Sequence, residues 1–394
     1  MEPTYNHITG PNYPLNHENK VRVIASFNGG GVRGAIAARI CQEIEEITKR
    51  SMVELVDCFA GTSVGGMLAI GLNVPKEKGS LLLKYTAREN VEFLKKNAAT
   101  IFPQSMNPLP KIAALFTSKY STTNLDKALK EHFGDMVISD SIKDVVIPSS
   151  EISRGGSPWW FSKQKIINLE NENAPPISEE AAKNVHVTDV LKASGSAPYY
   201  FPYYSIPFDG QEYHFVDGGC YANNPSAIGI SYAHLLYGSQ KPLLVGYFGT
   251  GAPPRPLSVP NLYFQGGLYW IWNYIATSMN LNADEASLIS KIQIQSELLR
   301  KPNEDYFEFQ PRISVLEYEL DDSSEANMNR LISATELYIK DNQFKIRNFC
   351  NQLLIAKGFD PIPVHTEEDI RHQQGIIDDF EVIEKEPNLC QIFF

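Results

Sequence analysis

The amino-acid sequence predicts an α/β fold, in which a parallel β-sheet carries helices on both faces. Three observations lead to this prediction. An apolar, β-rich run over Val21–Phe27 is followed by a glycine-rich loop and then by isoleucines at helical spacing over Ala35–Lys49. A second apolar run, Val53–Ala60, reads as a strand that ends at a turn with a serine between glycines. A small-residue segment over Val64–Leu72 follows as a buried helix. This strand–loop–helix–strand–turn–helix order opens a parallel sheet with helical crossovers.

The rest of the chain continues the alternation and shows no internal repeat. Residues 75–135 are expected to be mostly helical, with breaks at Pro103, Pro108 and Pro110, and the polar residues 171–183 form a surface excursion. Further strands are expected over Val145–Ile147, Trp159–Phe161, Tyr213–Val216, Leu243–Phe248 and Arg312–Leu320. Further helices are expected over Val187–Ala193, from Pro225 with Asn224 as its cap, over residues 283–300 with Leu288 and Ile292 at helical spacing, and over Ser324–Leu354 with Leu331, Leu337 and Phe344 facing inward.

The composition fits a packed protein and argues against several functions. Of the 394 residues, 43% are hydrophobic and 11% aromatic, which is enough for a core and excludes a disordered chain. The formal net charge of −11 argues against binding to a nucleic-acid polymer, because phosphates require a basic surface. The same charge argues against attachment to anionic membranes by electrostatics alone, while apolar insertion stays open.

The domain organisation is predicted from the linkers, and the compartment from the cysteines and the targeting signals. No long flexible linker divides residues 20–357, so one domain is expected there, between an irregular segment over 1–19 and a tail over 358–394. Five widely spaced cysteines without a C-x-x-C pair are typical of a reducing compartment. No secretory signal and no apolar run of 18 residues occurs, which predicts a cytoplasmic protein without a membrane span.

The stretch Gly61-Thr62-Ser63-Val64-Gly65 carries the strongest functional signal. Its glycines permit a sharp strand-to-helix turn that lifts the Ser63 hydroxyl clear of the backbone. Such strain is retained mainly where a protein does chemistry. Ser63 is therefore a candidate nucleophile.

Two further motifs supply what an attacking serine requires. The loop Asn28–Gly34 reads Asn-Gly-Gly-Gly-Val-Arg-Gly at a helix N-terminus, where the N–H groups of Gly30 and Gly31 are candidate oxyanion donors and Arg33 adds positive charge. Asp217 lies in an Asp-Gly-Gly turn after a strand and is a candidate base. A carboxylate of ordinary pKa is a weak base, but one that touches the hydroxyl in a desolvated site is stronger.

Each motif also has a rival interpretation. The loop from Gly29 to Gly34 fits a dinucleotide-binding fingerprint with Glu54 about twenty residues on, which predicts a nucleotide-binding or signalling module. His365 and His372 satisfy the order Ser…Asp…His of an α/β-hydrolase triad, but that fold has several strands before its nucleophile and only two fit here. A surface role is expected for both histidines.

Aromatic segments suggest either core packing or a lipid-facing lip. They are Tyr269–Tyr274 and the aromatics between Tyr199 and Tyr204. Asn261–Gly266 matches the end of a protease site used to remove purification tags; Pro260 replaces the expected glutamate, so we interpret it as native, although an engineered insertion stays an alternative.

Together the motifs resemble the patatin-like phospholipase family. Asn28–Gly34 is similar to its oxyanion loop, Gly61–Gly65 to its nucleophile elbow, and Asp217–Gly219 to its second catalytic element. Ala193–Pro202 and Asp321–Met328 resemble two further segments, so the likeness covers roughly residues 20–355. The sequence departs at the first loop position, where asparagine stands in place of a common aspartate but can still bond the turn. It departs again after the serine, where valine lies outside the chemistry.

The resemblance implies a three-layer α/β/α fold with a mostly parallel central sheet and a helical C-terminal part. It implies a lipid acyl hydrolase of the phospholipase A or lysophospholipase type, working through a Ser63–Asp217 dyad without histidine, metal or other cofactor. The oxyanion hole would comprise Gly29, Gly30, Gly31, Arg33 and Gly34, and the elbow Gly61, Thr62, Val64 and Gly65. The expected substrate is a phospholipid or other lipid ester met at a transient membrane contact. Activation by a nucleotide or a partner protein, and delivery as a bacterial effector, are also compatible.

Overall fold

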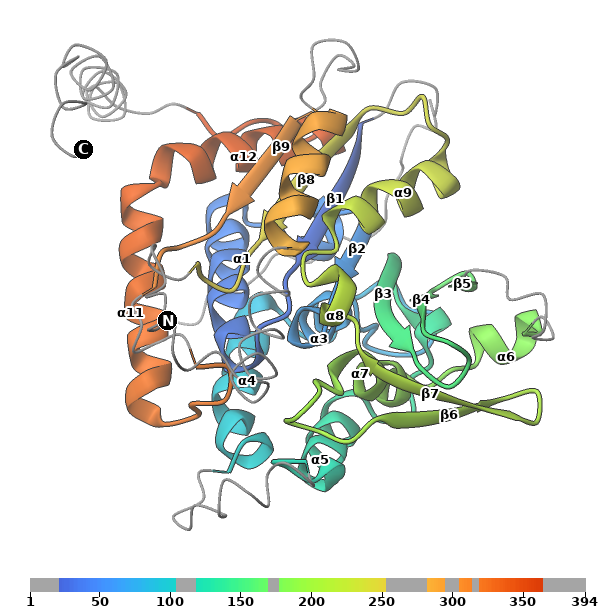
Figure 1. Ribbon diagram of the computed structural model, residues 1–394. Coiled ribbons are helices and arrows are strands. Elements are labelled where there is room, and N and C mark those ends of the chain that lie inside the picture. Colours follow the sequence, from blue (N-terminus) through green and yellow to red (C-terminus); the bar gives the residue numbers. More distant parts are fainter. Residues whose placement is uncertain are drawn as a thin grey trace, which may run out of the picture.

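A nine-stranded mixed sheet forms the centre of the protein (Figure 1). The computed structural model describes residues 21–103, 118–168, 177–252, 282–294, 305–313 and 319–363. The strands are β1 Arg22–Phe27, β2 Cys58–Gly61, β3 Asp144–Glu151, β4 Ser157–Ser162, β5 Ile166–Asn168, β6 Tyr204–Phe208, β7 Gln211–Asp217, β8 Leu243–Phe248 and β9 Asp305–Phe309. Their order is β5-β4-β3-β2-β1-β8-β9, and the hairpin of β6 and β7 joins through β3.

The central strands are parallel, and antiparallel strands lie toward one end of the sheet. β3, β2, β1, β8 and β9 run parallel to their neighbours. β4 and β7 both pair antiparallel with β3, β4 along residues 146–151 and β7 along residues 149–151, beyond the part that pairs with β2. The carboxyl ends of β1, β2 and β8 therefore meet at one edge, which is where open α/β sheets carry their sites.

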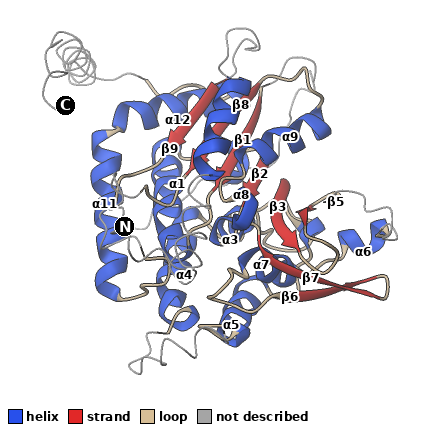
Figure 2. Ribbon diagram, viewed as in Figure 1, coloured by secondary structure: helices blue, strands red, loops and turns tan. Residues whose placement is uncertain are grey.

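Helices cover both faces of the sheet, as Figure 2 shows by colour. They are α1 Gly34–Thr48, α2 Met52–Leu55, α3 Val64–Gly71, α4 Ala87–Ile101, α5 Thr122–Phe133, α6 Glu179–Lys183, α7 Val187–Gly195, α8 Gly219–Ala222, α9 Ser226–Tyr237, an unlabelled helix over residues 282–294, α11 Glu325–Asp341 and α12 Gln343–Lys357. Short 3-10 turns lie at Gly31–Arg33 and Ile138–Asp140.

The alternation of side chains along β1 separates two cores. Val23 and Phe27 belong to the larger core, which includes residues of α1, α3, α7, α11 and α12. Ile24 points the other way, into a smaller core with Ile228 and Ile230 of α9. Because the sheet is buried on both faces, its central strands read as continuous apolar runs. The expected three-layer α/β/α fold is confirmed.

The apolar run Val53–Ala60 is not a single strand, and this part of the prediction was wrong. Residues Met52–Leu55 form the short helix α2, and β2 begins only at Cys58. Ser51 and Glu54 form a capping box in which the Glu54 carboxylate accepts the Ser51 N–H at 2.9 Å. Local capping thus starts a helix where apolar content alone indicated a strand.

The remaining differences lie in the C-terminal half and in two surface segments. The last parallel strand among the described residues is Asp305–Phe309; the strand expected over Arg312–Leu320 lies mostly outside the described residues, and Arg312 makes an isolated bridge to Ala252. Leu337 and Phe344 are 59% and 50% exposed instead of inward-facing, whereas Leu331 is fully buried. Residues 75–86 are irregular, and the excursion over 171–183 ends in α6.

Other expected elements match closely. β1, β8, α1, α3 and α7 lie where they were predicted. Helix α9 begins at Ser226, and the Asn224 side chain accepts the Ser226 N–H at 2.9 Å. In the helix over 282–294, Leu288 and Ile292 are exposed. The segments 1–19, Asn261–Gly266 and Tyr269–Tyr274, and the two C-terminal histidines, lie outside the described residues.

Candidate active site

Ser63 lies in a strained turn between β2 and α3. Its backbone has φ 56° and ψ −122°, a conformation that residues with a side chain rarely adopt. The flanking glycines are required sterically, since a Cβ on Gly61 or Gly65 would lie 2.2 Å from a carbonyl oxygen. The Ser63 N–H donates to the Ser194 hydroxyl at 3.0 Å, which fixes the turn from the outside. The predicted elbow geometry is therefore present.

The glycine loop follows β1 and keeps two N–H groups without a protein acceptor among the described residues. The N–H of Asn28 donates to Phe248, that of Gly29 to Asn223, that of Val32 to Leu320, and those of Arg33 and Gly34 to carbonyls of the loop itself. The N–H groups of Gly30 and Gly31 remain. A buried N–H without a partner is costly, so such a pair suits a ligand oxygen.

Packing explains why this loop consists of glycines. A Cβ on Gly30 would lie 2.3 Å from the Thr250 hydroxyl oxygen, and one on Gly31 would lie 2.0 Å from the Leu320 carbonyl oxygen. Gly31 also has φ 56°. The Thr250 hydroxyl donates to the Gly29 carbonyl at 2.8 Å, which ties the loop to the segment after β8.

Three members of the predicted oxyanion group are engaged elsewhere. Arg33 is 5% exposed, so it is not a solvated surface charge, and its Nε donates to the Gly30 carbonyl at 3.4 Å. Gly34 allows α1 to approach α3, because a Cβ there would lie 2.4 Å from Val64. The N–H groups of Gly29 and Gly34 are already bonded, which leaves Gly30 and Gly31 as the available donors in the loop.

Asp217 ends β7, opposite Ser149 of β3, and is 1% exposed. Its Oδ1 accepts the Gly219 N–H at 2.6 Å. Burial raises the pKa of Asp217 to about 6, against hydrogen bonds from the Gly219 N–H and the Ser63 side chain, which lower it. The carboxyl is thus more basic than an exposed aspartate yet still ionised at neutral pH.

One cavity brings the three sequence motifs together. Ser63, Asp217, Gly30 and Gly31 all line a space of about 360 Å³ that also includes its open mouth. The residues come from the ends of β2, β7 and β1, which are up to 187 positions apart in the chain. The candidate nucleophile, the candidate base and the two glycines therefore line the same small volume.

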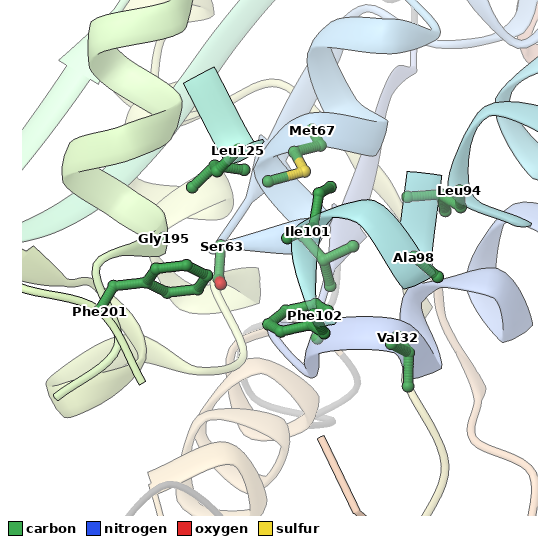
Figure 3. A pocket seen from close by; sticks show the side chains of 12 residues that line it. Val32, Ser63, Met67, Leu94, Ala98, Ile101, Phe102, Leu125, Gly195 and Phe201 are labelled. Atoms are coloured by element: carbon green, nitrogen blue, oxygen red, sulfur yellow. The ribbon is translucent and has the colours of Figure 1, made fainter. Parts of the chain in front are cut away.

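An apolar pocket of about 470 Å³, open at its mouth, adjoins the Ser63 hydroxyl (Figure 3). Its walls come from the 3-10 turn, α3, α4, α5 and the segment after α7. The side chains are those of Val32, Val64, Met67, Leu94, Ala98, Ile101, Phe102, Leu125 and Phe201. In Figure 3 Phe102 and Phe201 flank the hydroxyl, while Leu94 and Ala98 lie farther along α4. Hydrocarbon fits this lining and a charged group does not.

Several residues that shape the site carried no sequence signal. Ser194 bridges the Ser63 N–H and the Pro148 carbonyl; the Ala193–Pro202 segment resembles the family, but nothing in it marked Ser194 as a support of the turn. Thr250 and Leu320 contact the glycine loop from distant parts of the chain. Only the fold brings them to the loop.

The described part of the chain offers neither a metal cluster nor a membrane span. No three His, Cys, Asp or Glu side chains among the described residues gather closely enough to hold an ion. No helix there has both the length and the apolar character to cross a bilayer. The two C-terminal histidines stay untested.

Comparisons with known proteins agree with the geometry. The family profile described as "Patatin-like phospholipase" matches residues 25–229, slightly more than half of the chain. Phospholipase A I of Arabidopsis thaliana is 27% identical over 84% of this chain and 28% of its own length. Patatin-like protein 4 of the same plant is 30% identical over 56% of this chain and 54% of its own length. A cGAMP-activated phospholipase of Vibrio cholerae is 29% identical over 58% of this chain and 59% of its own length.

This chain spans well under two thirds of the length of each of these relatives. A solved structure, human GIVD cytosolic phospholipase A2, aligns with 85% of this chain and 60% of its own at a TM-score of 0.41 and 11% identity. The profile match over half of the sequence decides the assignment: the chain belongs to the patatin-like phospholipase family.

Proposed function

We propose that this protein is a lipid acyl hydrolase that cleaves fatty acyl esters through a covalent Ser63 acyl-enzyme, with Asp217 as the base. The observation that carries the proposal is the shared cavity. Ser63, the buried Asp217 and two glycines whose N–H groups have no protein acceptor among the described residues line one space, and an apolar pocket opens beside it. These are the parts that acyl transfer to a serine requires.

The first half of the reaction forms the acyl-enzyme. The Ser63 Oγ attacks the ester carbonyl carbon, and its proton passes to the Asp217 carboxylate. The N–H groups of Gly30 and Gly31 donate to the oxyanion, and the loss of one such donor typically costs about 2.7–4 kcal/mol of barrier. When the tetrahedral intermediate collapses, the carbon–oxygen bond to the leaving alcohol breaks and Asp217 returns its proton to that oxygen.

The second half repeats the chemistry with water. Asp217 removes a proton from water, the resulting hydroxide attacks the acyl-enzyme, and the fatty acid leaves as the proton returns to Ser63. A base works best with a pKa near the working pH, so the elevated pKa of about 6 suits Asp217 for both steps. No step requires histidine.

The apolar pocket beside Ser63 supports a fatty acyl chain as the group transferred. The substrate class is then a phospholipid or another lipid ester, met by transient contact with a membrane surface. The same lining argues against the glycine loop as a cradle for nucleotide phosphates, because the loop opens onto hydrocarbon.

Activation by a ligand is a second component of the proposal. Two bacterial relatives, from Vibrio cholerae and Escherichia coli, are cGAMP-activated phospholipases. We therefore include a cyclic dinucleotide among the conditions of every activity assay, since an untreated protein of this kind can be silent.

A fluorophosphonate probe and lipid mass spectrometry test the proposal. In the presence of a cyclic dinucleotide, wild type is expected to be labelled at Ser63 and to release fatty acid and lysolipid from mixed phospholipid vesicles; the same assay without the ligand measures how far activity depends on it. Ser63→Ala should abolish both, whereas Ser231→Ala, at an exposed serine of α9, should change neither. Activity should survive a chelator. An adduct mapped to another residue, or full turnover by Ser63→Ala, would refute the assignment.

A further inference from the structure

The segment over residues 319–324 lies against the glycine loop that we propose to bind the oxyanion. The Leu320 carbonyl accepts the Val32 N–H at 2.9 Å. The same oxygen occupies the place where a Gly31 side chain would begin, 2.0 Å from the ideal Cβ position. Leu320 also lines the cavity that holds Ser63 and Asp217. The position of Leu320 therefore determines where the Gly31 N–H points.

Asp321 holds this segment in place. Its carboxylate accepts hydrogen bonds from the Lys119 ammonium and, at 2.6 Å, from the Tyr120 hydroxyl. The side chain is 8% exposed, so solvent does little to weaken these contacts. Asp321 thus fixes its neighbour Leu320 relative to residues 119 and 120.

Residues 119 and 120 are in turn part of the rim of the site. Their N–H groups donate to the Tyr199 and Tyr200 carbonyls, each at 2.8 Å, and Tyr200 lines the same cavity as Ser63. The Tyr120 ring packs against Phe102 and Phe201 at centroid distances of 5.5 and 5.9 Å. These are the two rings that flank the Ser63 hydroxyl in Figure 3.

A second contact ties the segment to the acyl pocket. The Ser323 hydroxyl donates to the Phe102 carbonyl at 2.7 Å, at the end of α4. The 319–324 segment thus contacts the glycine loop, the end of α4 and residues 119–120 together. This segment lies about ninety residues beyond residues 25–229, which match the family profile. Residues 25–229 alone would therefore lack the contact between Leu320 and the glycine loop.

We infer that Asp321 is a positioning residue for the proposed reaction, which acts through Leu320 to aim the Gly31 N–H at the oxyanion. The inference rests on the proposed function. Removal of the negative charge weakens the contacts of Asp321 with the Lys119 and Tyr120 side chains and lets Leu320 shift against Gly31. A displacement on the order of 1 Å in a catalytic array costs about 100-fold in rate. The pocket walls keep their side chains, so acyl binding is retained.

The neighbouring Asp322 provides a matched control. Its carboxylate accepts the Ser324 N–H at 3.1 Å and lies 3.9 Å from Arg330, and it lines neither cavity. Asp321→Asn and Asp322→Asn therefore remove the same charge from adjacent positions, and only the first touches the rim of the site.

The test is turnover per functional site. The full chain and its variants are incubated with a fluorophosphonate to completion to count reactive Ser63, and hydrolysis of a short water-soluble ester is measured on the same preparations. Asp321→Asn is expected to lower kcat per site about 100-fold with KM within about twofold. Asp322→Asn should stay within about twofold of wild type in both. A purely structural role would lower the number of labelled sites and leave the turnover of each unchanged.

Tyr120→Phe keeps the inference testable if Asp321→Asn does not fold. It removes one hydroxyl from the Asp321 contact and should lower kcat per site by several-fold; the double variant should be no worse than Asp321→Asn alone. Wild-type kcat per site in either single variant, or a rise in KM alone, would overturn the inference while the proposed function stands. A wild-type protein that neither hydrolyses esters nor labels at Ser63 would overturn both.

Discussion

Asp217→Asn is expected to abolish activity and, at the same time, to stabilise the protein at neutral pH. The buried carboxyl has a pKa of about 6 instead of an ordinary 3.8. At 1.36 kcal/mol per pH unit, ionised Asp217 costs the folded state about 3 kcal/mol above pH 6. Asparagine is isosteric, keeps an acceptor for the Gly219 N–H and carries no charge. With an unfolding entropy of about 2.1 cal/mol/K per residue, Tm should rise by about 3–4 °C if the chain unfolds as one unit.

The sign of the pH dependence makes this prediction specific. Between pH 3.8 and 6 the folded wild type binds more protons than the unfolded chain, so its stability falls as pH rises through that window. The advantage of Asp217→Asn should therefore be full at pH 7 and vanish near pH 4. Thermal denaturation of both proteins from pH 4 to 8 measures it. An equal Tm at pH 7, or a difference that does not change with pH, would refute the reasoning.

Ester hydrolysis supplies the other half of this experiment. General base catalysis contributes about 100- to 10,000-fold, so kcat/KM of Asp217→Asn should fall by at least about 100-fold. In wild type, kcat/KM should decline below about pH 6 as Asp217 is protonated. Asp135, an exposed aspartate after α5, provides a control variant that should change neither activity nor Tm.

Three further predictions follow from the site. Ser63→Gly should be about 1 kcal/mol more stable than Ser63→Ala in thermal denaturation, because relief of the strain at positive φ exceeds the additional conformational entropy that glycine loses on folding. A glycine variant less stable than the alanine variant would contradict this. Ala98→Leu should lower kcat/KM for long-chain esters about tenfold and spare butyrate esters, while Ala99→Leu, on the exposed face of α4, should spare both; equal effects of the two would count against the acyl pocket. His365→Ala and His372→Ala should each keep wild-type ester turnover, and a large loss in either would favour a triad.

The sequence predicted those parts of the fold whose signals are local. β8 and α3 are nearly continuous runs of apolar residues and glycine, and they form where they were expected. Prediction failed where tertiary contacts decide. Leu337 and Phe344 have helical spacing, yet both are exposed. The core-facing side of α11 carries Leu331 and Ile339, and that of α12 carries Ile346 and Phe349. Periodicity identifies an amphipathic helix more reliably than it identifies the residues that face the core.

The site shows the same division. Ser63 and the loop from Gly29 to Gly34 can be recognised from the sequence by their glycines. These positions require glycine because other parts of the chain approach the backbone too closely for a side chain. Ser194 and Leu320 support those motifs through a hydroxyl and a main-chain carbonyl. Every residue has a main-chain carbonyl, so any residue type at position 320 could make this hydrogen bond. The contact therefore cannot be predicted from the sequence. Contacts of this kind can be identified only once the fold is known.

The Gly30 and Gly31 N–H groups, which have no protein acceptor in the described part of the chain, also bear on how a catalytic cycle would finish. A released fatty acid is itself a carboxylate, and Gly30 and Gly31 can donate to it as readily as to an ester oxyanion. The neighbouring Asp217, ionised above pH 6, repels that anion. We expect product inhibition by free fatty acid to strengthen as pH falls toward 6, so that the carboxylate which starts the reaction also helps to empty the site.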